Sequence, residues 1–151
     1  MSEHYVCFVP MKANFIPNGA ARDAAIAILR KAWPRAREIT SETSDYVVFR
    51  DCGENLESVR CPHCDTTLDI DLWQDRMDDD FSEERGFRLD ALPMPCCGVT
   101  STLNELRYDW PQGFSRFALV ATHSGGKVPQ ELLARLESAL GCRLRVIYQM
   151  Y

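Results

Sequence analysis

Hydrophobic residues in the N-terminal part of the chain follow the order strand, helix, strand. The run Tyr5–Val9 is apolar and rich in strand formers, and Pro10 ends it, which predicts a buried strand. Asn18 is a suitable N-cap for a helix that stops at Pro34. The apolar positions of this helix recur with a 3.6-residue period: Ala21, Ala24, Ala25, Ile28, Leu29 and Ala32. Tyr46–Phe49 then predicts a second strand.

The C-terminal part repeats the same order. Phe114–Ala121 predicts a strand, and Leu144–Tyr148 predicts the last one. Between them, Pro129 stands where a first-turn proline is tolerated and Gly141 is a natural C-terminal cap. The apolar stripe of this second helix is formed by four leucines, Leu132, Leu133, Leu136 and Leu140. Each end of the chain is therefore predicted to form a β-α-β unit.

Two such units indicate an α+β protein. We expect a ferredoxin-like βαββαβ arrangement, in which an antiparallel four-stranded sheet carries both helices on one face. Its second and third strands are neighbours, so the ends of a long segment between them meet at little cost in loop-closure entropy. We expect residues 1–51 and 111–151 to form this scaffold, with residues 52–110 as an insert between strands 2 and 3. The alternative is one mixed α+β domain whose middle strands extend the same sheet.

Composition supports a globular chain but also separates its middle from its ends. The 151 residues are 46% hydrophobic and 26% charged, as in an ordinary globular domain. The net charge of −5 divides into +2 for residues 1–50, −10 for residues 51–110 and +3 for residues 111–151. The total argues against non-specific nucleic-acid binding. The middle is also less apolar than the ends, so it is predicted to need another source of stability.

The cysteines supply a candidate source. Cys61-Pro62-His63-Cys64 is a C-x2-C pair, and Cys96-Cys97-Gly98 follows it. Four thiolates in a tetrahedron are a preferred site for zinc. We therefore predict that Cys61, Cys64, Cys96 and Cys97 bind a structural Zn²⁺, which supplies about 10–16 kcal/mol of apparent binding energy in small peptides.

The segment Cys61–Thr100 resembles zinc ribbons, in which two cysteine turns face each other across short strands. The second turn departs from that pattern, because its two cysteines are adjacent. Both reach one ion only if the backbone kinks between them, so His63, Cys52 or His123 is an alternative fourth ligand. The run from Cys96 to Phe114 also resembles small uncharacterised bacterial zinc-ribbon proteins, a resemblance that implies no activity.

Enzymatic roles find weaker support in the sequence. The tetrapeptide C-P-H-C resembles the active site of thioredoxin-like thiol oxidants, in which the first cysteine opens a helix. Here the alternating run Asp65–Ile70 predicts a strand instead. A catalytic zinc needs an open coordination position, which four cysteines would close. We predict buried or partly buried thiols at the other three cysteines, Cys7, Cys52 and Cys142.

Between the cysteine turns, an amphipathic helix is predicted. Leu72, Trp73, Met77 and Phe81 fall on one face, and the rest is a solvated acidic face formed by Asp75, Asp78, Asp79, Asp80, Glu83 and Glu84. The aromatic residues from Tyr108 to Phe117 are expected to pack where the insert rejoins the scaffold.

We therefore expect a non-catalytic, zinc-stabilised protein-interaction module whose acidic insert binds a basic protein partner. An antitoxin or immunity-type inhibitor is one form that fits the small size and acidity. A nucleic-acid-associated zinc ribbon is the first alternative, and a C-P-H-C thiol-disulfide oxidoreductase is the second. The sequence has no apolar run near the roughly 20 residues that cross a bilayer, and Met1–Pro10 lacks the pattern of a signal peptide, so a cytoplasmic location is expected.

Overall fold

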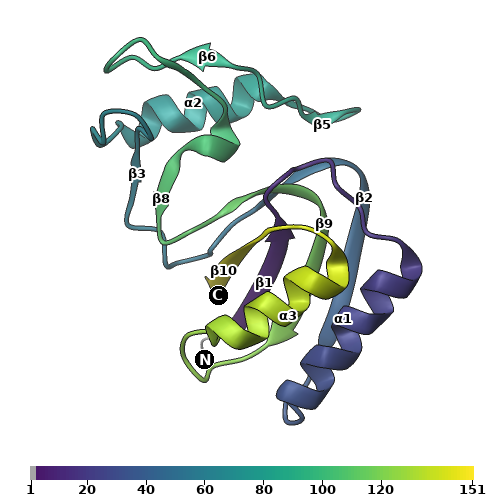
Figure 1. Cartoon of the computed structure of the whole chain (residues 1–151). Coiled ribbons are helices and arrows are strands. Elements are labelled where there is room, and N and C mark those ends of the chain that lie inside the picture. The colour runs from purple at the N-terminus through teal and green to yellow at the C-terminus, as the bar shows by residue number, and fades with distance from the viewer. Residues whose placement is uncertain (1–2) are drawn as a thin grey trace.

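The computed structural model describes residues 3–151, so the first two residues of the predicted scaffold lie outside it. The described chain has a mixed α+β fold with three α-helices and a mostly antiparallel sheet. Four long strands lie side by side in the order β10 (Leu144–Met150), β1 (His4–Pro10), β9 (Gly113–Thr122) and β2 (Ile39–Arg50). Each is antiparallel to its neighbours. Helices α1 (Gly19–Ala32) and α3 (Gln130–Leu140) cover one face of this sheet (Figure 1).

The two covering helices begin and end where local chemistry requires. The side chain of Asn18 accepts a hydrogen bond from the backbone N–H of Ala21, which caps α1 as predicted. Gly141 ends α3 in the left-handed conformation, with φ +78°, which glycine adopts without the usual steric cost. The predicted helices and the four predicted outer strands are therefore confirmed, with β2 extending seven residues further toward the N-terminus than the run at Tyr46 indicates.

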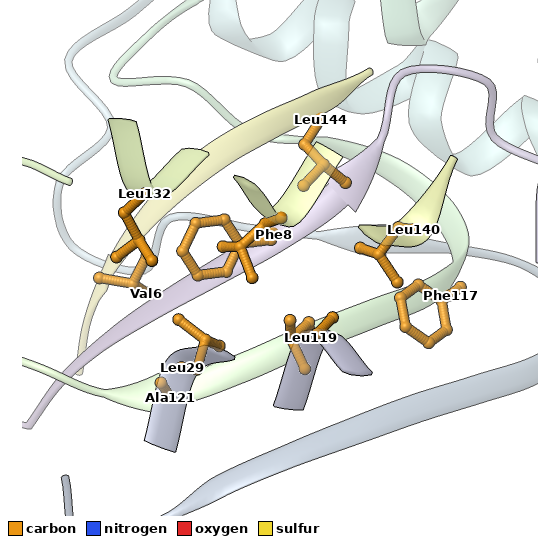
Figure 2. Packing of buried hydrophobic residues seen from close by; sticks show 11 residues of the cluster. Val6, Phe8, Leu29, Phe117, Leu119, Ala121, Leu132, Leu140 and Leu144 are labelled. Carbon is orange, nitrogen blue, oxygen red and sulfur yellow. The ribbon is translucent and has the colours of Figure 1, made fainter. Parts of the chain in front are cut away.

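The main core lies between this sheet and the two helices. Val6 and Phe8 of β1 point toward the helices and are almost fully buried, whereas the alternate residues Cys7 and Val9 are buried on the opposite face. Figure 2 shows the side chains of the main core pointing toward one another from the strands and the helices. Its labelled members are Val6, Phe8, Leu29, Phe117, Leu119, Ala121, Leu132, Leu140 and Leu144.

The opposite face of the sheet is partly covered by the segment that follows β2, residues 51–55. Cys52 is buried there against Cys7 and Ile147, in a small second-face core. The segment then reaches β10, where Asn55 donates to the carbonyl of Tyr148 at 2.9 Å. This packing confirms the prediction of buried thiols at Cys7 and Cys52, and Cys142 is half-buried.

The middle of the chain forms short elements beyond one end of the long strands (Figure 1). They are β3 (Ser58–Arg60), α2 (Ile70–Asp80), β4 (Phe81–Ser82), β5 (Gly86–Phe87), β6 (Leu92–Pro93), β7 (Thr100–Ser101), the 3-10 helix η1 (Leu103–Glu105) and β8 (Arg107–Asp109). β5 pairs in parallel with β2 through Val47 and Gly86, and β4 pairs with β5. Two of the middle strands, β5 and β4, therefore extend the sheet to six strands, as the alternative arrangement predicts. The other four form two separate two-stranded sheets, β3 with β8 and β6 with β7.

A further core joins the middle of the chain to the long strands. It combines Trp73, Met77 and Tyr108 from the middle with Val47 and Phe114 from β2 and β9. Tyr108 and Phe114 therefore pack at this junction as expected, whereas Phe117 belongs to the main core and Trp110 is 43% exposed. Because the core draws on both parts, the middle does not bury its apolar side chains alone.

Three expectations for the middle are wrong. Asp65–Ile70 is not a strand: Thr67 forms a single bridge with Arg60, and the carboxylate of Asp69 caps α2 by accepting from the N–H of Asp71. Leu72 and Phe81 are exposed, because only Trp73 and Met77 on this helix turn toward the core.

The third wrong expectation concerns Asp80, which was predicted to lie on the solvated acidic face of the helix. Its side chain is buried, and the carboxylate accepts hydrogen bonds from the backbone N–H groups of Leu89 and Asp90. Two backbone donors satisfy a carboxylate that is withdrawn from water, so Asp80 anchors the chain that follows β5.

Arg145 ties β10 to the returning chain. Its guanidinium donates to the side chain and the backbone carbonyl of Asn104 and to the carbonyl of Gln112, at 2.9–3.0 Å. We expect Arg145→Met to lower the free energy of unfolding by about 2–3 kcal/mol, because these partly buried acceptors lose a charged donor. Urea denaturation measures the effect. The matched change Arg143→Met, at a side chain that is 89% exposed, should cost less than about 0.5 kcal/mol, and an equal loss in both variants would contradict the account.

Candidate metal centre

The first cysteine turn comprises residues 61–66 and follows β3 directly. The N–H of Asp65 donates to the carbonyl of Cys61 at 3.0 Å, and the N–H of Cys61 donates to the carbonyl of Thr66 at 2.9 Å. Asp65 takes a left-handed conformation with φ +64°, which lets the chain reverse. The N–H of His63 lies 3.4 Å from the sulfur of Cys61 and donates to it. Such N–H···S contacts orient thiolate ligands in metal sites.

The second cysteine turn, residues 94–99, has the same backbone pattern. The N–H of Gly98 donates to the carbonyl of Met94 at 2.8 Å, and the N–H of Met94 donates to the carbonyl of Val99 at 3.0 Å. Gly98 has φ +77° and stands where Asp65 stands in the first turn. The flanking pairs also correspond, because Arg60 bridges Thr67 and Pro93 pairs with Thr100.

This correspondence explains how adjacent cysteines reach one point. Met94 takes the place of the first cysteine and is buried, whereas Cys96 and Cys97 occupy the third and fourth places of the turn. The turn itself therefore supplies the backbone kink that lets the adjacent Cys96 and Cys97 face the same point. Sequence reasoning missed the role of Met94, although the proline that follows both Met94 and Cys61 was a signal for it.

The two turns bring four sulfurs together. The sulfurs of Cys61, Cys64, Cys96 and Cys97 all lie within 4.8 Å of one another. Cys61 and Cys97 are 3.8 Å apart, and Cys64 and Cys96 are 3.3 Å apart. A tetrahedral zinc about 2.3 Å from each sulfur needs sulfurs about 3.8 Å apart, so the cluster has dimensions that accommodate the ion. All four thiols are free of disulfide bonds.

The three alternative ligands lie elsewhere. Cys52 is in the second-face core, where its sulfur and its N–H contact the side-chain oxygen of Gln112. The ring of His123 stacks on Trp33 with centroids 3.9 Å apart. His63 sits in the first turn, but its Nε2 lies 3.3 Å from the carbonyl of Thr100. None of the three belongs to the sulfur cluster.

Burial and charge differ among the four cysteines. Cys61 is buried, whereas the other three are exposed. Hydrogen bonds from the side chain and N–H of Thr66 lower the pKa of Cys64 to about 6. Desolvation and the neighbouring thiol of Cys64 raise the pKa of Cys96 to about 12. At this distance the four thiols do not all ionise without a cation, because neighbouring thiolates repel one another. A bound divalent metal would offset that repulsion.

A set of ion pairs fixes the first turn to β8. Arg60 contacts Asp65 and Asp109, each at 2.9 Å, and Arg107 contacts Asp65 at 2.8 Å. The hydroxyl of Ser58 also donates to Asp109. Hydrogen bonds from Ser58 and Arg60 hold the pKa of Asp109 below its usual value. These contacts join the first turn to β8.

Comparison of the chain with protein-family models, with curated proteins and with solved structures finds no match. None of the helices in residues 3–151 is long and apolar enough to span a membrane. The chemistry of the centre therefore follows from its own donor set, four sulfur ligands at metal-binding spacing.

Proposed function

We propose that the protein is a non-catalytic protein-interaction module that a structural zinc stabilises, and that its acidic middle segment binds a basic protein partner. Its scaffold, residues 1–51 and 111–151, is proposed to be ferredoxin-like, with residues 52–110 as the zinc-binding insert. The antiparallel strand order β10-β1-β9-β2, with both helices on one face, supports this topology.

A structural rather than catalytic zinc is supported by the donor set. Four sulfurs fill a tetrahedral shell and leave no position for water or substrate. The ion would link the loop after β3 to the loop between β6 and β7, which lie more than 30 residues apart in the sequence. Such a link stabilises a segment whose strands have only two or three residues each.

A redox role finds less support. Thiol oxidants place the first cysteine at the N-terminus of a helix, which lowers its pKa. Cys61 instead follows β3, and the next helix begins only at Ile70. Seven free cysteines fit a reducing compartment, so we place the protein in the cytoplasm.

Nucleic-acid binding on the sheet also finds less support. That mode uses an open sheet face with exposed aromatic rings. Here residues 51–55 cover part of the face, and Trp33, beside the basic residues Arg35 and Arg37, has its ring between Phe8 and His123. The contact with His123 therefore occupies part of the surface of this ring.

The observation that carries the proposal is the separation of charge. Residues 51–110 hold a net charge of −10, whereas the remaining residues are basic overall. On α2 the carboxylates of Asp71, Asp75, Asp78 and Asp79 are exposed and have no ion-pair partner in residues 3–151. An unpaired surface of one sign steers a partner of the opposite sign. An antitoxin or immunity-type inhibitor is one form of such a binder.

Affinity capture with the full chain tests the proposal. The wild-type protein and the variant D71N/D75N/D78N/D79N are immobilised and exposed to a lysate of the source cells. A control variant, D23N/E38Q/D45N/E131Q, loses the same charge from exposed scaffold positions. We expect a basic protein on the wild type and on the control, and its loss from the α2 variant. Equal retention on all three, or capture of nothing, would contradict the proposal.

A further inference from the structure

A groove lies between α2 and strand β6, and Pro95, which precedes Cys96, also lines it. Its volume is about 300 Å³. Apolar surface comes from Leu72 on α2 and from Leu92 and Pro93 on β6, where the two leucines are 56% and 43% exposed. Carboxylates come from Asp75 and Asp79, on the same side of α2. We call this feature the α2–β6 groove.

Hydrogen bonds connect the two walls of the groove, α2 and the chain around β6. Arg76 of α2 donates to the carbonyls of Asp90 and Ser101, and Arg88 donates to the carbonyl of Asp79 and pairs with Asp90 at 3.1 Å. These contacts connect the helix to the chain on both sides of β6. The groove is therefore preformed, and binding into it costs little ordering of the protein.

Arg76 and Arg88 also line the groove, but they do not neutralise Asp75 and Asp79. Asp75 and Asp79 are exposed, four residues apart, and neither carboxylate has an ion-pair or hydrogen-bond partner in residues 3–151. Like charges at this spacing destabilise a helix by about 0.2–0.5 kcal/mol. Asp78, Asp79 and Asp80 also lie at the C-terminal end of α2, where negative charge opposes the helix dipole. A cationic occupant would relieve both effects.

We propose that the α2–β6 groove is the docking site for a basic amphipathic segment of the partner protein. One apolar side chain of that segment lies between Leu72 and Leu92, and flanking lysines or arginines pair with Asp75 and Asp79. The inference rests on the proposed function and narrows it to one surface and one chemistry.

The test uses a fluorescein-labelled 18-residue helical peptide of leucine and lysine, with leucines on one face, and the purified full chain. Fluorescence anisotropy at low salt should show saturable binding, which weakens as salt screens the ion pairs. A peptide with glutamate in place of lysine should not bind. Wild-type protein that fails to bind the lysine peptide overturns the inference.

Matched variants locate the site. D75N/D79N should weaken binding about tenfold, because two ion pairs of about 0.5–1 kcal/mol are lost. D78N/E84Q removes the same charge from exposed positions outside the groove and should weaken binding less than about threefold. L72S/L92S should weaken binding, whereas I70S/V99S, at equally exposed apolar positions, should not.

Equal weakening by D75N/D79N and D78N/E84Q would show attraction to the acidic surface as a whole, and would overturn the groove while leaving the proposed function intact. Sedimentation velocity tests whether the groove instead binds a second copy of this chain. A wild-type dimer that L72S/L92S abolishes would identify the groove as an interface between copies of this chain, which also overturns the inference.

Discussion

Replacement of Cys61 by serine is expected to abolish zinc binding at the proposed centre and to unfold the middle of the chain while the main core stays folded. Cys61 is the buried member of the cluster, and its sulfur is 3.8 Å from that of Cys97. Three remaining ligands should hold the ion at least about 100-fold less tightly, since loss of a supporting partner alone costs 10–100-fold. Zinc content and methyl NMR spectra measure the two effects.

The methyl signals make this result specific. Met77 and Met94 belong to the core that the middle segment shares with β2 and β9, whereas Leu119 and Leu136 belong to the main core between sheet and helices. The methionine signals should collapse in Cys61→Ser, and the leucine signals should persist. Cys142→Ser, at a half-buried thiol outside the cluster, should leave zinc and both sets of signals unchanged. Unaltered zinc content in Cys61→Ser would contradict the assignment of the ligands.

Phe114→Ala is expected to give the largest loss of stability among single core changes, about 3–5 kcal/mol. Phe114 is fully buried on β9, and its ring lies 5.0 Å from the rings of both Phe49 and Phe87. It therefore joins a long strand to the middle of the chain. Urea denaturation, followed by tryptophan fluorescence, measures the loss.

The matched change for this prediction is Phe81→Ala. Phe81 also contacts Phe87, with centroids 5.1 Å apart, but it is 42% exposed. It should cost less than about 1 kcal/mol, because less apolar surface returns to water. Comparable losses in the two variants would contradict a core shared between the long strands and the middle.

The parts of the fold that local chemistry determines could be predicted from the sequence. Asn18 and Pro34 mark the ends of α1, and Gly141 marks the end of α3, because caps and breakers act within a few residues. The apolar runs of β1, β9 and β10 are buried strands for the same reason. The long N-terminal half of β2 was missed, because its exposed residues are polar and its pairing with β9 is not local.

Tertiary contacts decided the rest. The alternating run at Asp65–Ile70 has a strand-like pattern, but Asp69 caps α2 and only Thr67 finds a bridge partner. The burial of Asp80 depends on two N–H groups supplied by residues nine and ten positions later. The crossing of residues 51–55 to β10 depends on contacts nearly a hundred residues apart, which no local pattern records.

The cysteine cluster could be predicted in part from local pattern, and the rest depended on tertiary structure. The C-x2-C pair and the adjacent pair indicated that Cys61, Cys64, Cys96 and Cys97 lie together, as they do. The adjacent pair nevertheless left His63, Cys52 and His123 open as an alternative fourth ligand. The placement of adjacent cysteines at the third and fourth positions of a turn that begins at Met94 needed the backbone hydrogen bonds. The sequence therefore indicated the cluster, and backbone geometry explains how the four sulfurs converge.

The most direct test of the zinc centre is native mass spectrometry of the purified full chain, combined with titration of its accessible thiols. The account predicts one zinc per chain and protection of Cys61, Cys64, Cys96 and Cys97 from alkylation, with all four becoming reactive once a chelator removes the ion. A chain that binds no metal after purification with zinc, or that alkylates at Cys64, Cys96 and Cys97 while still carrying zinc, would contradict it.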